Sequence, residues 1–140
     1  MSVVDTNVLV HSVAAGSPDH ARARRALAHL TSAGSVAVTR QVLREYVAAT
    51  TRPQSWSRAF TLAEATADTD TFAGRFAILE DGPRVWDEFM VLTRRVAFGG
   101  KQVHDANIVA TMLAHGETRL LTFNTADFRR FGGVIEVITP

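Results

Sequence analysis

Four acidic side chains spread along the chain are the residues best suited to chemistry: Asp5, Glu45, Asp105 and Asp127. Each one ends a predicted strand or lies on a helix just beyond one, and each has apolar neighbours that would normally pack in a core. A carboxylate held against a core is costly unless a positive charge compensates it, and neighbouring carboxylates raise one another's pKa. A cation with oxygen ligands, Mg²⁺ or Mn²⁺, would supply that charge. Such a metal site can hydrolyse a phosphodiester.

Each of these residues also has a purely structural explanation. Asp5 could cap the helix that follows it, and Asp105 suits the first turn of its own helix. Glu45 could be a helix residue paired with a nearby arginine. Asn124 and Asp127 could form an Asx turn and a cap. The metal-site interpretation therefore depends on the convergence of all four carboxylates at one edge of the fold.

The histidines are weaker candidates for catalysis. His104 is next to Asp105, but adjacent helix residues point about 100° apart, so the two side chains cannot both face one site squarely. We therefore expect His104 to support the site or to be structural. His20, His29 and His115 have no ligand spacing with one another, and we expect surface or core positions for them.

The elements that must position these residues alternate between strand and helix. Strands are predicted at residues 2–5, 36–38, 76–79, 119–122 and 134–138, and helices at 8–14, 18–30, 40–50, 57–69, 83–95 and around His104 and Asp105. This alternation predicts an α/β fold with a central parallel sheet of about five strands, flanked by helices on both faces. Ligands bind beyond the carboxyl ends of the strands in such sheets, which is where the acidic residues would gather.

The composition sets further limits. A chain of 140 residues with 46% hydrophobic residues suits one domain over residues 1–140 with one core. There are no cysteines, which excludes disulfides and cysteine-ligated zinc, so we expect a protein of the reducing cytoplasm. No apolar run approaches the ~20 residues of a membrane span, and no signal peptide is evident. The formal charge of +1 favours no particular partner.

Almost all of the cationic residues are arginine. The chain has 15 Lys and Arg together, and Lys101 is the only lysine. Arginine suits phosphate oxygens, although a high-GC coding bias explains the same preference. The candidates for phosphate contact are Arg22, Arg24, Arg25, Arg52, Arg94, Arg95 and Arg129.

The ordered set of acidic motifs resembles a PIN domain, and specifically a VapC-type toxin ribonuclease of a type II toxin–antitoxin system. The matching segments are Val4-Asp5-Thr6-Asn7, Glu45, His104-Asp105-Ala106 and residues 121–128. The spacing and the total length also fit, so the resemblance covers essentially the whole chain. The terminal motif is weak alone, whereas the ordered set is fairly specific.

The resemblance implies an Mg²⁺-dependent endoribonuclease, with Mn²⁺ as a possible substitute, that cleaves single-stranded RNA. It implies Asp5 and Asp105 as direct metal ligands, with Glu45 and Asp127 completing the acidic set. Asn124 stands where some family members have an aspartate, so either Asn124 or Asp127 could be the fourth polar group. The resemblance also implies a cognate antitoxin that blocks the pocket, a homodimer and no membrane association.

Two other functions remain open from the sequence. A haloacid-dehalogenase-type phosphatase also places an aspartate after its first strand, but it needs a second aspartate two residues later, where this chain has Asn7. A non-catalytic PIN-like binding module would keep the scaffold without metal affinity or nuclease activity. The Ala-rich helices within residues 8–30 and 57–69 could frame a groove for an antitoxin helix, although ordinary packing on the sheet explains them equally well.

Overall fold

The computed structural model describes all residues 1–140 and contains one five-stranded sheet. Its strands are β1 (Ser2–Val4), β2 (Val36–Thr39), β3 (Ala77–Leu79), β4 (Arg119–Leu121) and β5 (Glu136–Ile138). They lie in the order β3-β2-β1-β4-β5, and every neighbouring pair is parallel. The α/β prediction is therefore confirmed. Strand β1 occupies the centre of the sheet.

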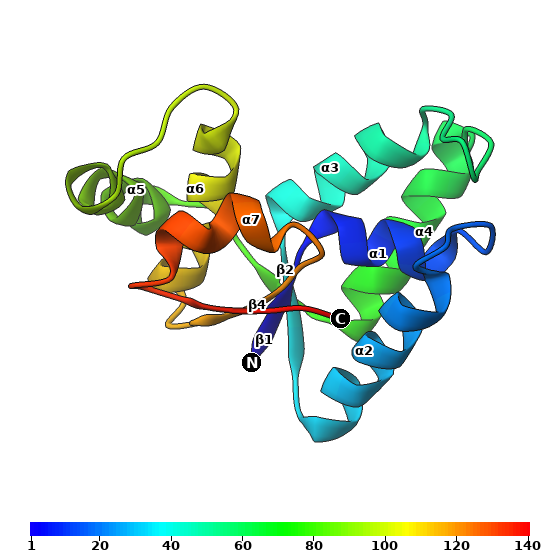
Figure 1. Ribbon diagram of the computed structural model, residues 1–140, viewed down its shortest axis with the longest axis horizontal. Helices are drawn as coiled ribbons and strands as arrows, with labels where there is room; N and C mark the ends of the chain where they lie inside the picture. The colour runs from blue at the N-terminus through cyan, green and yellow to red at the C-terminus, as the bar shows by residue number, and fades with distance from the viewer.

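Seven helices pack around this sheet (Figure 1). They are α1 (Thr6–Val13), α2 (His20–Ala33), α3 (Arg40–Thr50), α4 (Leu62–Arg75), α5 (Pro83–Arg95), α6 (Gln102–Ala114) and α7 (Thr125–Phe128). Helices α1 to α4 pack against one another on one side of the molecule, and α5 and α6 form a pair on the other. A 3-10 turn, η1 (Arg129–Phe131), follows α7.

The central strands supply the middle of the hydrophobic core. Val3 and Val4 of β1, Val38 of β2 and Leu120 of β4 are fully buried. Burial of one such aliphatic side chain contributes about 1.5–3 kcal/mol to the free energy of unfolding. The short apolar runs read from the sequence are therefore the strands that hold the two helical layers together.

Some predicted helix boundaries were wrong. The first helix begins at Thr6 rather than at residue 8, because Asp5 is its N-cap and accepts a hydrogen bond from the Thr6 amide. The fourth helix was predicted from residue 57, but it begins at Leu62. Thr61 and Glu64 form a capping box there that starts the helix.

Two further local features differ from the sequence-based prediction. The second helix begins at His20, so Pro18 lies in the preceding turn instead of in the first helical turn. The short helix α7 directly after β4 was not predicted, and it carries Asp127. None of the helices combines the length and the apolar character that a bilayer crossing requires.

The strand order determines where the polar residues meet. Val4 of β1 pairs with Leu121 of β4, so Asp5 and Thr122 leave neighbouring strands at the same edge of the sheet. Strand β2, on the other side of β1, runs directly into α3 at Thr39. The residues after β1, β2 and β4 therefore surround one point beyond the carboxyl ends of the strands.

Candidate functional site

Asp5 is a buried carboxylate at the centre of this edge, with only 5% of the residue exposed. Its Oδ1 accepts a hydrogen bond of 2.8 Å from the Thr6 amide. Its Oδ2 accepts hydrogen bonds of 2.9 Å from Asn7 Nδ2 and 2.7 Å from Thr122 Oγ1. Both its oxygens are therefore oriented by groups from two different segments of the chain.

These hydrogen bonds do not fully offset the burial of Asp5. Burial raises the pKa of Asp5, the donors Thr122 and Thr6 oppose that increase, and the nearby Glu45 carboxylate adds to it. The net pKa is raised above the ordinary value. A carboxylate has about four lone-pair sites, and three hydrogen bonds leave one of them for another partner. Asp5 is therefore positioned to gain from a nearby cation.

Glu45 of α3 lies next to Asp5 and is also held at both oxygens. Thr6 Oγ1 donates to Glu45 Oε2 at 3.0 Å, and Gln41 Nε2 donates to Oε1 at 2.8 Å. The same Gln41 amide donates to the His104 carbonyl oxygen at 2.8 Å, and Asn107 Nδ2 donates to Gln41 Oε1 at 2.8 Å. The buried Gln41 thus joins α3 to α6 and fixes the direction of Glu45.

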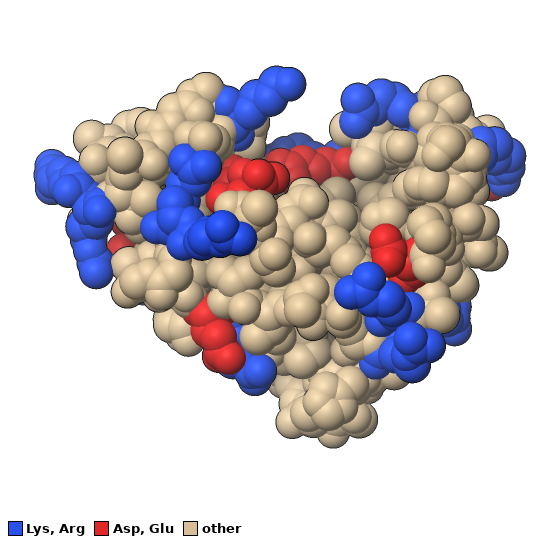
Figure 2. Space-filling model, viewed as in Figure 1, with Lys and Arg blue, Asp and Glu red and all other residues tan.

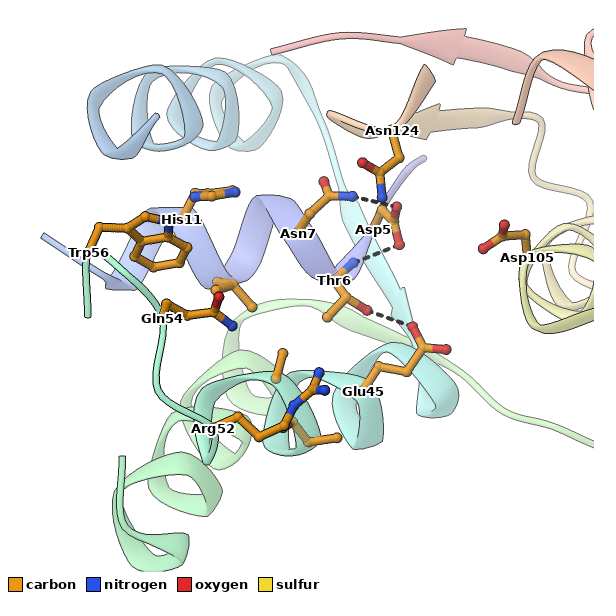
Figure 3. A pocket seen from close by; sticks show the side chains of 13 residues that line it. Asp5, Thr6, Asn7, His11, Glu45, Arg52, Gln54, Trp56, Asp105 and Asn124 are labelled. Atoms are coloured by element: carbon orange, nitrogen blue, oxygen red, sulfur yellow. Dashed lines mark hydrogen bonds between the residues drawn. The ribbon is translucent and has the colours of Figure 1, made fainter. Parts of the chain in front are cut away.

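Asp105 lies in the first turn of α6, facing the other two carboxylates across the cleft (Figure 3). It is partly buried, and its side chain forms no hydrogen bond or ion pair within the chain. Burial, together with the neighbouring carboxylates, raises the pKa of Asp105 to about 6, against a weaker opposing effect of Arg130. The charges that raise it belong to Asp5, Asp127 and Glu45.

Asn124 and Asp127 take different positions at this site. Asn124 lines the cleft together with Asp5 and Asp105. Asp127 is exposed on α7 and does not line the cleft, although its charge contributes to the raised pKa of Asp105. The structure therefore places Asn124 in the cleft with the acidic residues. Asp127 lies outside the cleft and affects Asp105 only through its charge.

The cleft that these residues line has a volume of about 450 Å³. Figure 2 shows acidic side chains at the bottom of a hollow, with basic side chains on both sides of it. The lining residues are Asp5, Thr6, Asn7, Val10, His11, Glu45, Ala48, Ala49, Arg52, Gln54, Trp56, Asp105 and Asn124. A hollow with a negative floor and positive flanks suits a polyanion that is bound through a cation.

The donor set fits Mg²⁺ or Mn²⁺, since every candidate ligand is an oxygen. No group of three acidic or histidine side chains lies close enough to form a complete protein cage for a metal. Mg²⁺ usually keeps several waters and needs only one or two carboxylates. Asp105, which has no partner, and Asp5, which has a free lone pair, are the residues that would hold it.

Sequence reasoning missed several residues of this site. Asn7 was part of the matching N-terminal motif but was given no role at the site, yet it donates to Asp5 and Thr122 and accepts from the Phe123 amide. Gln41 carried a signal that could have been used, because it precedes Glu45 by four residues on a helix. Nothing in the sequence indicated that the loop after α3 would return to the cleft.

None of the four histidines considered from the sequence lines the cleft. His104 is exposed, and its backbone carbonyl, rather than its ring, contacts Gln41. His20 and His115 hydrogen-bond to backbone carbonyls, and His29 is exposed. The histidine that does line the cleft is His11, which the sequence did not single out.

Comparisons with known proteins match the chain to one family and to one fold. The family profile described as PIN domain matches residues 2–134. The chain is 30% identical to ribonuclease VapC24 of Mycobacterium tuberculosis over 134 residues, which cover 94% of this chain and 92% of the relative.

Two solved structures share the fold. One is VapC20 of M. tuberculosis, a toxin that cleaves the sarcin-ricin loop, with a TM-score of 0.74, 20% identity and complete coverage of both chains. The other is a toxin–antitoxin complex from Klebsiella pneumoniae, with a TM-score of 0.70 and 21% identity, covering 100% of this chain and 98% of the other.

Proposed function

Because the chain belongs to the PIN domain family, as its motifs indicated, we propose that it is a metal-dependent endoribonuclease that cleaves single-stranded RNA. We also propose that it acts as the toxin of a toxin–antitoxin pair. The observation that carries the nuclease proposal is Asp105. This partly buried carboxylate has a pKa raised to about 6 and no partner in the chain, and it faces Asp5 across an open cleft.

In the proposed mechanism Asp5 and Asp105 would hold Mg²⁺ at the bottom of the cleft. An ion held there would supply the chemistry of a Lewis acid, a lower pKa for water and stabilisation of charge on the scissile phosphate. Glu45, fixed by Thr6 and Gln41, orients water through hydrogen bonds to its carboxylate. The Asn124 amide offers hydrogen-bond donors to a phosphate oxygen from the opposite wall of the cleft.

Substitution of the two proposed ligands tests the nuclease proposal. Asp5→Asn and Asp105→Asn should each lower RNA cleavage by more than about 100-fold, since even outer-shell partners of a metal typically contribute 10- to 100-fold. Asp70→Asn is the matched control, because Asp70 is exposed on α4 away from the cleft. Cleavage of labelled RNA with and without Mg²⁺ would be measured, with circular dichroism as the folding check.

The same samples separate this proposal from the alternatives. A binding module would show neither Mg²⁺ affinity by calorimetry nor cleavage of RNA. A phosphatase would hydrolyse a small phosphomonoester and would not cleave RNA. Undiminished cleavage by Asp105→Asn in Mg²⁺ would show that this residue is not a ligand.

A groove between the first two helices and α4 supports the antitoxin proposal. It has a volume of about 350 Å³, and its lining includes Val13, Leu27 and Phe72, with Arg24 and Arg75 among its polar residues. An amphipathic antitoxin helix would place its apolar side there. Leu27→Asp should therefore weaken inhibition by a co-expressed antitoxin while RNA cleavage continues. Loss of cleavage together with inhibition would instead indicate a damaged fold.

We further propose that the protein acts in the cytoplasm, which its lack of cysteines favours, and that it forms a homodimer, which the resemblance to its family implies. Light scattering of the purified protein would give its mass in solution. A mass close to that of one 15.2 kDa chain at micromolar concentration would contradict the dimer.

A further inference from the structure

The cleft has a second end that contains no carboxylate. Its acidic residues gather at one end, whereas His11, Arg52, Gln54 and Trp56 line the other (Figure 3). We call these four residues the base pocket. It combines two aromatic rings with an amide and a guanidinium group, so its chemistry differs from that of the acidic end.

Helix α1 connects the two ends of the cleft. Asp5 is its N-cap, and His11 lies six residues further along the same helix. At a rise of 1.5 Å per residue this separation is about 9 Å, which is comparable to the length of a nucleotide. The small or apolar residues Val10, Ala48 and Ala49 also line the cleft. A nucleotide with its phosphate at the acidic end can therefore place its base in the base pocket.

The aromatic rings of the base pocket are held in place by their neighbours. The His11 ring lies 5.1 Å from that of Trp56, with an angle of 40° between the ring planes, and 5.2 Å from that of Phe123 in an edge-on contact. Trp56 is only partly buried, and its indole borders the cleft. An exposed aromatic face at a fixed position is a stacking surface for an unpaired base.

The His11 ring also has a free hydrogen-bonding nitrogen. Its Nδ1 contacts Ser17 Oγ, which already accepts from the Asp19 amide. The Ser17 hydroxyl can then donate to Nδ1, which favours the tautomer with the proton on Nε2. That Nε2 has no hydrogen-bond partner in the chain. Burial also lowers the pKa of His11, which favours the neutral ring.

The loop that carries Trp56 has a defined backbone. The Gln54 amide donates to the Ser57 carbonyl at 2.8 Å, and the Phe60 amide donates to the Thr50 carbonyl at 2.7 Å. Gly16 lies so close to this loop that a Cβ atom there would be 2.3 Å from the Trp56 carbonyl oxygen. The stacking surface is therefore formed before any ligand binds, which lowers the entropic cost of binding.

The polar side chains of the base pocket are free to pair with a ligand. Arg52 uses its Nε for the Ala48 carbonyl, at 3.2 Å, and its two terminal nitrogens make no hydrogen bond in the chain. The Gln54 side chain makes none. Amide and guanidinium groups are the ones that pair in bidentate fashion with the edges of adenine and guanine.

We propose that the base pocket binds one unpaired nucleobase adjacent to the scissile phosphate, stacked on Trp56 and hydrogen-bonded to Gln54 and Arg52. The proposal rests on the proposed function, because the ribonuclease assignment puts a phosphate at the acidic end. A base in a duplex could not enter such a pocket, so we expect binding to require single-stranded RNA. A cationic antitoxin side chain fits less well, because Arg52 is positive and no carboxylate lies at this end.

The test measures the affinity of the protein for labelled RNA tetranucleotides in the presence of Ca²⁺. Each tetranucleotide is compared with versions of itself that lack the base at one position. Trp56→Ala should weaken binding by about 5- to 150-fold, the usual range for loss of one stacked base. Trp56→Phe should retain most of the affinity. Trp86→Ala is the matched control, since Trp86 lies on α5 and is 62% exposed. It should bind RNA like the parent.

Removal of the base identifies what Trp56 contacts. One position of the tetranucleotide should hold the base that stacks on Trp56. When that base is removed, the RNA should bind the Trp56→Ala variant and the unsubstituted protein with equal affinity. An equal loss at every abasic position would overturn the proposal, and so would an equal loss in Trp86→Ala. Variants that bind RNA normally and lose only inhibition by a co-expressed antitoxin would show that the pocket serves the antitoxin instead.

A second variant guards against misfolding. Gln54 is exposed, so Gln54→Ala should leave the fold intact and change the preference among the four homopolymeric tetranucleotides. An unchanged preference would contradict its role. Because binding is measured without cleavage, the base pocket and the nuclease proposal can fail separately. A protein without nuclease activity could still lose RNA affinity in Trp56→Ala only when one particular base is present.

Discussion

The Gln41 side-chain amide donates a hydrogen bond of 2.8 Å to Glu45 Oε1, four residues further along α3, and an equal one to the His104 carbonyl on α6. One buried side chain thereby links two helices that meet at the site and sets the direction of a carboxylate in the cleft. Gln41 is a positioning residue, since it lines no part of that cleft.

Gln41→Leu should lower kcat for RNA cleavage by about 10- to 100-fold with a smaller change in KM, as for other outer-shell partners of metal sites. The leucine keeps the volume but cannot orient Glu45. Asn107→Leu should have a weaker effect in the same direction, because Asn107 acts on Glu45 only through Gln41. Steady-state kinetics with a labelled RNA would give both constants. An unchanged kcat in Gln41→Leu would show that Glu45 needs no such support.

Asp105 should make the stability of the metal-free protein depend on pH. Its pKa is raised from 3.8 to about 6 in the folded state, so the folded protein binds more protons than the unfolded chain between these values. The contribution of Asp105 to stability is therefore lost as the pH rises through this window. Asp105→Asn should raise the melting temperature at pH 7.5 and leave it nearly unchanged at pH 4. Equal melting temperatures at pH 7.5 would contradict the raised pKa.

The affinity for Mg²⁺ should also depend on the protonation of Asp105. A ligand carboxylate must lose its proton to bind the metal, so the apparent affinity falls as the pH drops below about 6. Calorimetry at pH 7.5 and pH 5 should show weaker binding at the lower pH, by at most about tenfold per pH unit for one proton. A pH-independent affinity would argue that Asp105 lies outside the metal's coordination.

Tyr46 should contribute to stability through one buried hydrogen bond. Its hydroxyl donates to Asp68 Oδ2 at 2.6 Å, and the residue is fully buried between α3 and α4. Burial and the Asp68 carboxylate both raise the pKa of Tyr46, so the phenol stays protonated. Tyr46→Phe should lower the free energy of unfolding by about 1.5–3 kcal/mol in urea titrations, as expected for a hydrogen bond to a charged group. RNA cleavage should not change.

Gly16 should be hard to replace, because a Cβ at this position would clash with the Trp56 backbone carbonyl. Gly16→Ala should lower the free energy of unfolding by about 1–3 kcal/mol, the usual cost of overpacking, because one of the two loops must move. Gly74→Ala is the matched control, since it has open space around it and lies within a helix, where alanine is favoured. Equal stability of the two variants would indicate that the loop adapts without cost.

The sequence by itself determined the class of fold and the candidate acids. Buried β-branched runs and helical periodicity are local signals, so the strands and most helices could be read directly from the chain. The predicted start of α4 was wrong, although Thr61 and Glu64 match the sequence pattern of a capping box and would have indicated the correct start. The roles of Asp5, Glu45, Asp105, Asn124 and Asp127 stay predictions.

Only the tertiary structure decided which side chains meet. The order β3-β2-β1-β4-β5 puts Thr122 against Asp5, 117 residues away, and the packing of α6 against α3 joins Asn107 to Gln41. The return of Trp56 to the cleft depends on a close approach of two loops at Gly16. Strand pairing and loop packing depend on contacts between distant segments, and residue periodicity along the chain does not encode them.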